Sequence, residues 1–216
     1  MIAIVGGTGP EGAGLATRFA MAGEAVAIGS RSAARAEEAA ARIRQAVGGS
    51  AGVSGGENST VAGEADIIIL AVPLEGVEPA LSELAPILAG KLVVSVVAAV
   101  RFVEGRPEPV SLPAGSVAQT VAELLPDSQV ASAFHTLSAS KMADTGVRLD
   151  EDTIICGASL EVRSRVIELA QRIEGLCGVD GGRLANSHYS EQFVGMLAAL
   201  NRLHKARAGL RIVDLE

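Results

Sequence analysis

IAIVGGTGPEGAGL, residues 2–15, joins an apolar strand, a glycine-rich turn and the first turns of a helix. The apolar run Ile2–Val5 predicts a buried strand, and residues 7–12 follow it with the spacing G-x-G-x-x-G. In this context the first glycine permits a tight turn, the second lets a pyrophosphate approach the backbone, and the third lets helix and strand pack closely. The helix N-terminus adds amide donors and a partial positive charge. We therefore expect a dinucleotide to be bound by Gly7, Thr8, Gly9, Pro10, Glu11 and Gly12.

The alternation of strands and helices continues beyond this first unit. Apolar runs predict strands near 2–5, 25–29, 66–71, 91–97 and 129–134. Amphipathic segments between them predict helices near 10–22, 32–47, 76–88 and 116–125. This succession is typical of parallel strands joined by right-handed helical crossovers. The expected fold is α/β, with a Rossmann-type, mostly parallel, doubly wound sheet.

The pattern changes after residue 135. A strand at Thr153–Cys156, a helix over 160–173 and a long helix over 187–206 are expected there. We interpret residues 1–158 as the Rossmann domain and 159–216 as a smaller, mainly helical C-terminal unit that closes the substrate cleft. Residues 101–115 carry three prolines and two glycines, which predicts a long loop of the kind that often covers a site. The glycine-rich residues 48–56 also predict a loop, with room for one weak strand.

The end of the second predicted strand distinguishes between two cofactors. In NAD-binding units an acidic residue at this position accepts hydrogen bonds from the ribose hydroxyls. Here the sequence is Gly29-Ser30-Arg31, and no carboxylate is available. Arg35 lies one helical turn after Arg31, so two guanidinium groups can converge on a 2′-phosphate, with hydroxyl donors from Ser30 and Thr8. The stretch favours NADP over NAD.

Composition excludes several classes of partner. The chain has 216 residues, 49% of them hydrophobic, which is enough for a sizeable core. Its net charge of −7 provides no basic face for nucleic acid or an anionic membrane. The longest apolar runs are shorter than the roughly 20 residues of a membrane helix, and a strand at residue 2 leaves no room for a secretion signal. We expect a cytoplasmic protein without a membrane span. Cys156 and Cys177 fit buried apolar positions better than a disulfide or a metal site, so no metal is expected.

Pairs of residues suited to acid–base catalysis are scarce. Tyr189 is the only tyrosine, and Phe193 stands where a Tyr-x-x-x-Lys pair needs its lysine. No Lys or His base with an orienting carboxylate is evident. A hydride passed directly between two bound cofactors needs no such base, because binding and orientation supply most of the catalysis.

A combination of motifs resembles the NADPH-dependent reductases of the deazaflavin coenzyme F420. The motifs are Gly6-Gly7-Thr8-Gly9, Gly29-Ser30-Arg31, Ala71-Val72-Pro73 and Phe134-His135-Thr136-Leu137, in the order that this family has. The resemblance covers essentially the whole chain. Two departures stand out: Ala98-Ala99 occupies a place where family members usually have a proline, and Pro10-Glu11 differs from several relatives.

The resemblance implies hydride transfer between NADP(H) and coenzyme F420, in a cleft between the sheet and the C-terminal unit. It implies that the 2′-phosphate is held by Thr8, Ser30, Arg31 and Arg35, and that Val72 and Pro73 lie beside the nicotinamide. It also implies that the deazaflavin is flanked by Ala98, Ala99, His135 and Leu137. His135 is the candidate catalytic residue, which would orient the ring without obligatory proton transfer.

Two other functions stay open at this point. The chain can be an NADPH-dependent reductase of another acceptor, such as a flavin, an imine or a ketone, because one fold serves many chemistries. It can also be an NADP-binding sensor without catalytic activity. The apolar positions Phe193, Leu197, Leu200 and Leu203 have helical spacing that serves either the subunit's own core or a dimer contact. The family resemblance implies a homodimer.

Overall fold

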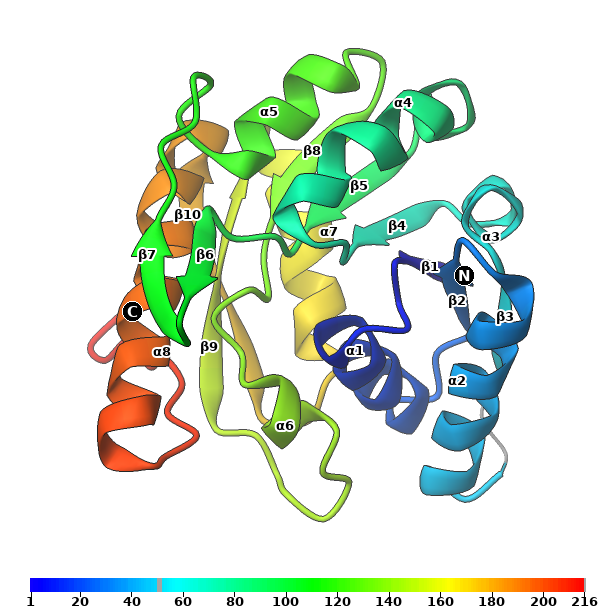
Figure 1. Cartoon of the computed structure of the whole chain (residues 1–216), viewed down its shortest axis with the longest axis horizontal. Helices are drawn as coiled ribbons and strands as arrows, with labels where there is room; N and C mark the ends of the chain where they lie inside the picture. The colour runs from blue at the N-terminus through cyan, green and yellow to red at the C-terminus, as the bar shows by residue number, and fades with distance from the viewer. Residues whose placement is uncertain (50–51, 216) are drawn as a thin grey trace.

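The computed structural model describes residues 1–49 and 52–215 (Figure 1). Within these residues the main sheet has eight strands in the order β10-β9-β8-β5-β4-β1-β2-β3. They are Ile2–Val5 (β1), Val26–Ser30 (β2), Val53–Glu57 (β3), Ile67–Leu70 (β4), Leu92–Ser95 (β5), Gln129–Ser132 (β8), Glu151–Gly157 (β9) and Leu176–Arg183 (β10). Neighbouring strands are parallel, except that β8 and β9 are antiparallel. The predicted α/β fold with a mostly parallel sheet is confirmed.

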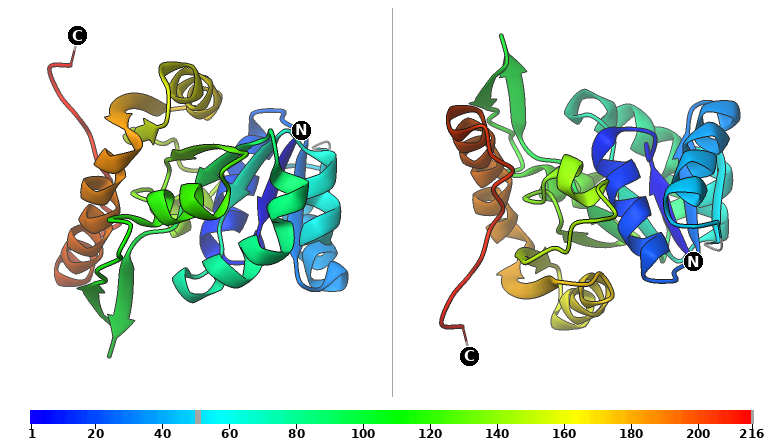
Figure 2. Two further views of the ribbon diagram at one scale, coloured as in Figure 1. Left: turned by 90° about the horizontal axis from the view of Figure 1, so that it is seen from above. Right: turned by 90° about the horizontal axis from the view of Figure 1, so that it is seen from below.

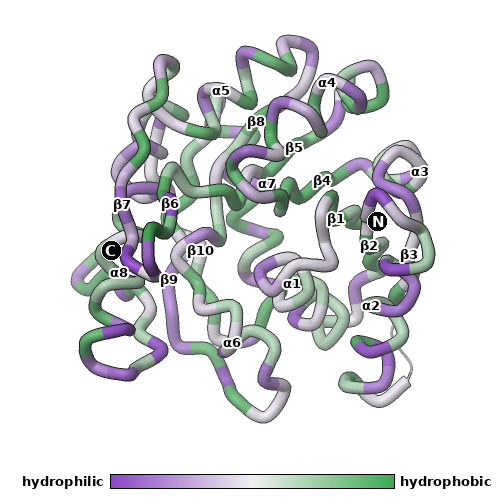
Figure 3. Tube along the Cα trace, in the orientation of Figure 1, coloured by the Kyte–Doolittle hydropathy of each residue, from purple (hydrophilic) through white to green (hydrophobic). Residues whose placement is uncertain are grey.

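Helices cover both faces of this sheet (Figure 2). One face carries Pro10–Met21 (α1), Ala33–Ala46 (α2) and Leu160–Gln171 (α7), and the other carries Asn58–Glu64 (α3), Val77–Leu88 (α4) and Val117–Leu124 (α5). A cluster of buried apolar side chains joins each helical layer to the strands. The central strands β4 and β5 are covered on both sides and are accordingly almost continuously apolar, with Ser95 at the end of β5 as the exception (Figure 3).

The order of strands reverses between β1 and β4. From β1 the chain proceeds through β2 to β3 on one side, and from β4 it proceeds through β5 to β8 on the other. Open α/β sheets bind their ligands outside the carboxyl ends of the strands at such a switch point. The glycine turn 6–12 follows β1, and residues 71–73 follow β4. Both segments therefore lie at the place where a ligand is expected.

The prediction of a loop over residues 101–115 is wrong for its first half. Val100–Val103 (β6) and Arg106–Pro109 (β7) form an antiparallel hairpin. Its two turn residues, Glu104 and Gly105, have positive φ angles of 50° and 73°, as a tight hairpin turn requires. Pro107 and Pro109 argue against a strand in the sequence, because proline cannot donate a backbone hydrogen bond. In an isolated hairpin, however, both strands have free edges on which proline is tolerated.

The sequence pattern also fails to predict β10, α3 and a short helix at Ala139–Met142 (α6). β10 contains Gly178, Gly181 and Gly182, which break the apolar alternation of an ordinary strand. A Cβ at Gly178 would lie 3.0 Å from the Cα of Ile167 on α7, so the glycine lets strand and helix approach closely. β10 pairs with β9, and the main sheet therefore continues beyond residue 158. The weak strand allowed for in residues 48–56 is present as β3.

The C-terminal part ends in a long helix, Ser187–His204 (α8). Figure 2 shows α8 beside the β6–β7 hairpin at one end of the molecule. Residues 205–215 then return along β9, where the carbonyl of Leu210 accepts a hydrogen bond from Asp152 N at 2.8 Å. Among the described residues no helix is long and apolar enough to cross a membrane, and no three His, Cys, Asp or Glu side chains form a potential metal site.

Candidate cofactor site

The three glycines of the G-x-G-x-x-G motif have different surroundings. A Cβ at Gly7 would lie 2.8 Å from Ile4 O, and a Cβ at Gly12 would lie 2.7 Å from the Cα of Gly7, so neither position has room for a side chain. A Cβ at Gly9 would have a single neighbour, Gly6 O at 3.8 Å. The fold itself therefore has room for a side chain at Gly9. A bound diphosphate needs that space, and the turn fits such a group.

The glycine turn is fixed to the neighbouring strands by Gly6. This residue has φ +74°, and a Cβ on it would lie 2.7 Å from Val72 Cγ1. Its amide donates a hydrogen bond to Oδ1 of Asn58, at the start of α3, at 3.2 Å. Val72 and the following Pro73 thus lie beside the turn, on the loop that follows β4. Asn58 is not among the residues that the sequence predicts, because its partner lies 52 positions away.

The end of β2 presents two cations. Ser30 is buried and accepts a hydrogen bond from Ser32 N at 3.3 Å, and Ser32 caps α2 by accepting from Arg35 N at 3.5 Å. Arg31 and Arg35 are exposed, and their guanidinium groups form no hydrogen bond or ion pair with any described residue. Thr8 and Pro10 are exposed at the turn, and Glu11 is half-buried in the first turn of α1. The two arginines are thus available to a phosphate.

A strained turn follows β8 at the same edge of the sheet. Phe134 has φ +66°, and His135 N donates to Ala133 O at 2.9 Å, which makes a three-residue γ-turn around Phe134. The phenylalanine is fully buried, with its ring edge against Phe19 of α1 at a centroid distance of 6.0 Å. Its amide donates to Thr153 Oγ1 at 2.7 Å. Such strain costs free energy and tends to persist where it orients a functional group; here it fixes the position of His135.

His135 and its neighbours contain buried polar atoms without partners. Neither ring nitrogen of His135, which is 6% exposed, has a hydrogen-bond partner among the described residues, and neither does Thr136 Oγ1 or Ser132 Oγ. Burial lowers the pKa of His135 to about 4, and the nearby carbonyls of Ala133 and Ser190, which do not reach hydrogen-bond geometry with the ring, offset only part of this effect. The imidazole is therefore neutral at pH 7. Unpartnered buried polar groups are costly, so this cluster fits a polar ligand that completes their hydrogen bonds.

The remaining predicted residues lie at the same edge of the sheet. Ala98 and Ala99 follow β5, where Val100 N donates to Ala98 O and Val110 N donates to Ala99 O, both at 2.8 Å. Leu137 follows His135 by two positions and is buried in the apolar cluster that contains Phe134. β5 and β8 are parallel neighbours, so their carboxyl ends are adjacent. The structure thus places the residues expected around the second cofactor on two neighbouring strand ends.

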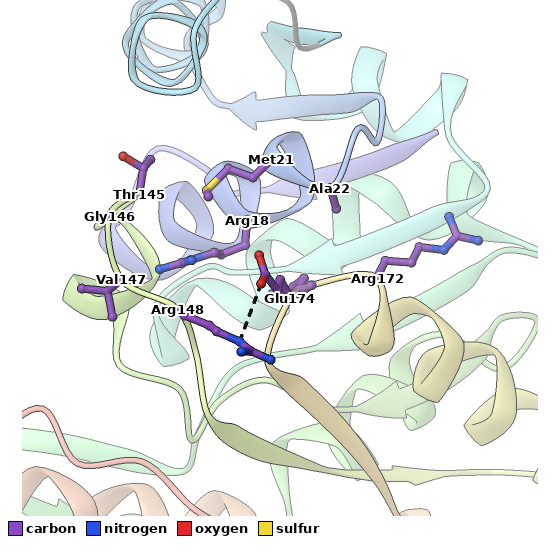
Figure 4. A pocket seen from close by; sticks show the side chains of 10 residues that line it. Arg18, Met21, Ala22, Thr145, Gly146, Val147, Arg148, Arg172 and Glu174 are labelled. Atoms are coloured by element: carbon purple, nitrogen blue, oxygen red, sulfur yellow. Dashed lines mark ion pairs between the residues drawn. The ribbon is translucent and has the colours of Figure 1, made fainter.

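A hollow of about 270 Å³ lies at the opposite end of α1 from the glycine turn (Figure 4). Its lining includes three arginines, all of which are engaged: Arg18 donates to the carbonyls of Lys141, Met142 and Asp144, and Arg148 and Arg172 pair with Glu174 and Glu24. None of the predicted site residues lines this hollow. A smaller hollow of about 190 Å³ begins at Leu74, directly after Pro73, and extends to Val117 at the start of α5.

The fold and the geometry of the glycine turn define a Rossmann-type dinucleotide-binding protein. Residues 1–99 match the family described as NADP oxidoreductase, coenzyme F420-dependent. The chain is 37% identical to the F420-dependent NADP reductase of Methanocaldococcus jannaschii, over 100% of this chain and 99% of that protein. It is 35% identical to the enzyme of the same name from Methanothermobacter marburgensis, over 99% and 98% of the two chains. The chain belongs to this family of F420-dependent NADP oxidoreductases, and the predicted resemblance is confirmed.

A solved structure supports the same fold. The crystal structure described as a putative F420-dependent NADP reductase from Arthrobacter sp. FB24 has a TM-score of 0.82 and covers 98% of both chains at 24% sequence identity. The β9–α7–β10–α8 segment is therefore included in the likeness.

Proposed function

We propose that this protein is an F420-dependent NADP reductase, which transfers a hydride between NADP(H) and coenzyme F420. The main support is the open space at Gly9, in a glycine turn that packs against Val72 through Gly6 at the switch point of the sheet, in a chain that belongs to this family. When bound, the two coenzymes supply the chemistry, a hydride exchanged between C4 of the nicotinamide and C5 of the deazaflavin. The protein has to bind both coenzymes, orient the two rings and exclude water.

NADP(H) binding follows from the first half of the chain. The amides of the glycine turn and the N-terminus of α1 attract the diphosphate, and Gly9 lets it approach the backbone. Arg31 and Arg35 hold the 2′-phosphate by charge-assisted hydrogen bonds, helped by the hydroxyl groups of Thr8 and Ser30. In this proposal Gly7, Pro10, Glu11 and Gly12 complete the turn, and Val72 and Pro73 line the nicotinamide side.

F420 binding is assigned to the ends of β5 and β8. Ala98, Ala99 and Leu137 provide an apolar wall, and His135 provides a polar contact. A neutral imidazole that is buried and has two unpartnered nitrogens is suited to donate one hydrogen bond and accept another. Because its pKa is about 4, we propose that His135 orients the deazaflavin rather than carrying a proton at neutral pH.

The closure of the cleft, the cellular location and the oligomeric state belong to the same proposal. We propose that residues from 159 onward close the cleft and that the protein is a cytoplasmic homodimer. On α8, Leu197 is buried in the subunit's own core, whereas Leu200 and Leu203 are 37% and 75% exposed. The exposed pair supports a contact with a second copy, and light scattering of wild type and Leu203→Glu tests it.

A single assay tests the function. Purified protein is mixed with NADPH and oxidised F420, and the visible absorbance of F420 is followed; rapid loss of that absorbance supports the proposal. Turnover with a flavin, imine or ketone but not with F420 would favour a reductase of another acceptor. Tight NADPH binding without turnover of any acceptor would favour a sensor.

A further inference from the structure

Glu11 is an acidic residue inside the turn that the proposal assigns to a negatively charged diphosphate. It is the second residue of α1, two positions after Gly9, which caps the helix. Its Oε1 is sealed from solvent and has no hydrogen-bond partner among the described residues. The residue as a whole is half-buried, so the loss of solvent falls on this one oxygen. Burying a carboxylate oxygen without a partner is costly, which favours the protonated form.

The direction of the Glu11 side chain follows from the face of α1 on which it lies. Glu11, Gly14 and Arg18 are spaced so that they share one face of the helix. A Cβ at Gly14 would lie 2.9 Å from Met142 Cβ, and Arg18 Nε donates to Met142 O at 2.8 Å, so this face is covered by α6. Glu11 extends the same face by one turn toward the glycine turn.

Within residues 1–49 and 52–215, no ion pair or side-chain hydrogen bond joins Glu11 to a cation. Arg18 on α1 is engaged with three carbonyls, Lys141 on α6 is paired with Glu151, and His135 in the loop before α6 is neutral at pH 7. Arg31, directly after β2, and Arg35 of α2 are exposed to solvent. Although a helix N-terminus favours a negative charge, burial alone raises the pKa of Glu11 from 4.5 to about 8. The carboxyl is thus neutral at pH 7 and ionises in mildly alkaline solution.

We propose that Glu11 is a proton-linked control of NADP(H) affinity: the neutral acid admits the dinucleotide, and the ionised carboxylate opposes its diphosphate. This inference rests on the proposed function, because it assumes that the turn binds NADP(H). By linkage, a bound dinucleotide that disfavours the ionised form makes the protein take up a proton when it binds. Affinity therefore falls as the pH rises above 8.

The test measures the Kd of NADPH by its fluorescence at pH 7, 8 and 9. The 2′-phosphate is almost fully ionised over this range, since a phosphate monoester has its second pKa near 6. If only the neutral acid binds, the wild-type Kd rises about tenfold between pH 7 and pH 9. Glu11→Gln, which cannot ionise, should change less than about twofold. Glu38→Gln removes an exposed carboxylate of α2 and should keep the wild-type profile. Glu191, whose pKa is about 7, is present in all three proteins and cancels from the comparison.

A second measurement needs no variant. Calorimetry of NADPH binding at pH 8, in two buffers of different ionisation enthalpy, should show uptake of about half a proton per NADPH, because half of the free protein is ionised there. A pH-independent wild-type Kd, the same pH profile in Glu11→Gln, or no proton uptake would overturn the inference while leaving the proposed function intact. Failure of the wild type to bind NADPH at pH 7 would instead contradict the proposed function, and this inference with it.

Discussion

Glu191 of α8 accepts hydrogen bonds from two backbone amides at the start of α5, with Oε2 at 2.8 Å from Val117 N and Oε1 at 3.1 Å from Ala118 N. The carboxyl is completely buried, and Ser187 Oγ donates to Ser116 Oγ at 2.7 Å beside it. Helix N-termini leave such amides without intrahelical partners, and an acceptor from another element can satisfy them. Glu191 therefore holds α8 against the N-terminus of α5, at the end of the sheet that carries the candidate site.

Replacing Glu191 by Ala should destabilise the protein by about 3 kcal/mol, because two buried amide donors lose their acceptor. Chemical denaturation measures this change in the free energy of unfolding. The matched control is Glu168→Ala, an exposed carboxylate on α7, which should change stability by no more than about 0.5 kcal/mol. Equal stability of the two variants would show that the contact does not hold α8.

The same group predicts a pH dependence of stability. Burial raises the pKa of Glu191 from 4.5 to about 7, against the opposing effect of the Val117 and Ala118 amides. Because the folded-state pKa lies above the unfolded one, the stabilisation is fully present below pH 4.5 and is lost as the pH rises toward 7. Glu191→Gln should flatten the decline of the unfolding free energy between pH 5 and 7, by at most about 1.4 kcal/mol per pH unit. An unchanged slope would contradict the assignment.

Selectivity for NADP over NAD should depend on Arg31 and Arg35. Charge-assisted hydrogen bonds to a phosphate are worth roughly 1.5–3 kcal/mol each, so each Ala variant should weaken NADP binding at least about tenfold. NAD affinity should hardly change. Arg42→Ala, an exposed arginine further along α2, is the control and should bind both cofactors normally. Calorimetric titration decides the matter, and equal losses for NADP and NAD would remove the basis for the assignment.

Gly9 should be required for binding and dispensable for folding. A Cβ at Gly9 would have one neighbour at 3.8 Å, and a Cβ at Gly63 of α3 would likewise have one neighbour, at 3.9 Å. Gly9→Ala and Gly63→Ala should therefore fold alike by circular dichroism. NADPH fluorescence should show at least about tenfold weaker binding for Gly9→Ala, and Gly9→Val should abolish binding, because the side chain occupies the place of the diphosphate. Normal binding by Gly9→Val would mean that the turn is only structural.

His135 should contribute orientation rather than proton transfer. Loss of one or two hydrogen bonds from a neutral imidazole should lower turnover or F420 affinity about three- to tenfold in His135→Ala. Loss of an obligatory acid or base would cost about 10² to 10⁴ in rate. Steady-state kinetics distinguishes the two, with His204→Ala at the exposed end of α8 as a control. Activity at the uncatalysed level, with both cofactors still bound, would contradict the orienting role.

The sequence predicts those features of the fold and the candidate site that depend on residues close together in the chain. The glycine turn and the arginines after β2 each lie within a single strand–turn–helix unit, so spacing alone predicts them. Asn58 and Glu191 are missed because each acts on a residue more than 50 positions away, Gly6 and Val117 respectively. β10 is missed because its glycines serve close contact with α7 and leave no apolar alternation to detect.

In the proposed function a hydride passes directly between NADP(H) and F420, whose reacting rings this protein holds face to face. The most direct measurement uses NADPH stereospecifically deuterated at C4, oxidised F420 and the wild-type protein in ordinary water, with the product analysed by NMR. If the transfer is direct, deuterium from one face of the nicotinamide appears at C5 of the deazaflavin. Hydrogen from solvent at that carbon, or no reduction of F420 at all, would contradict it.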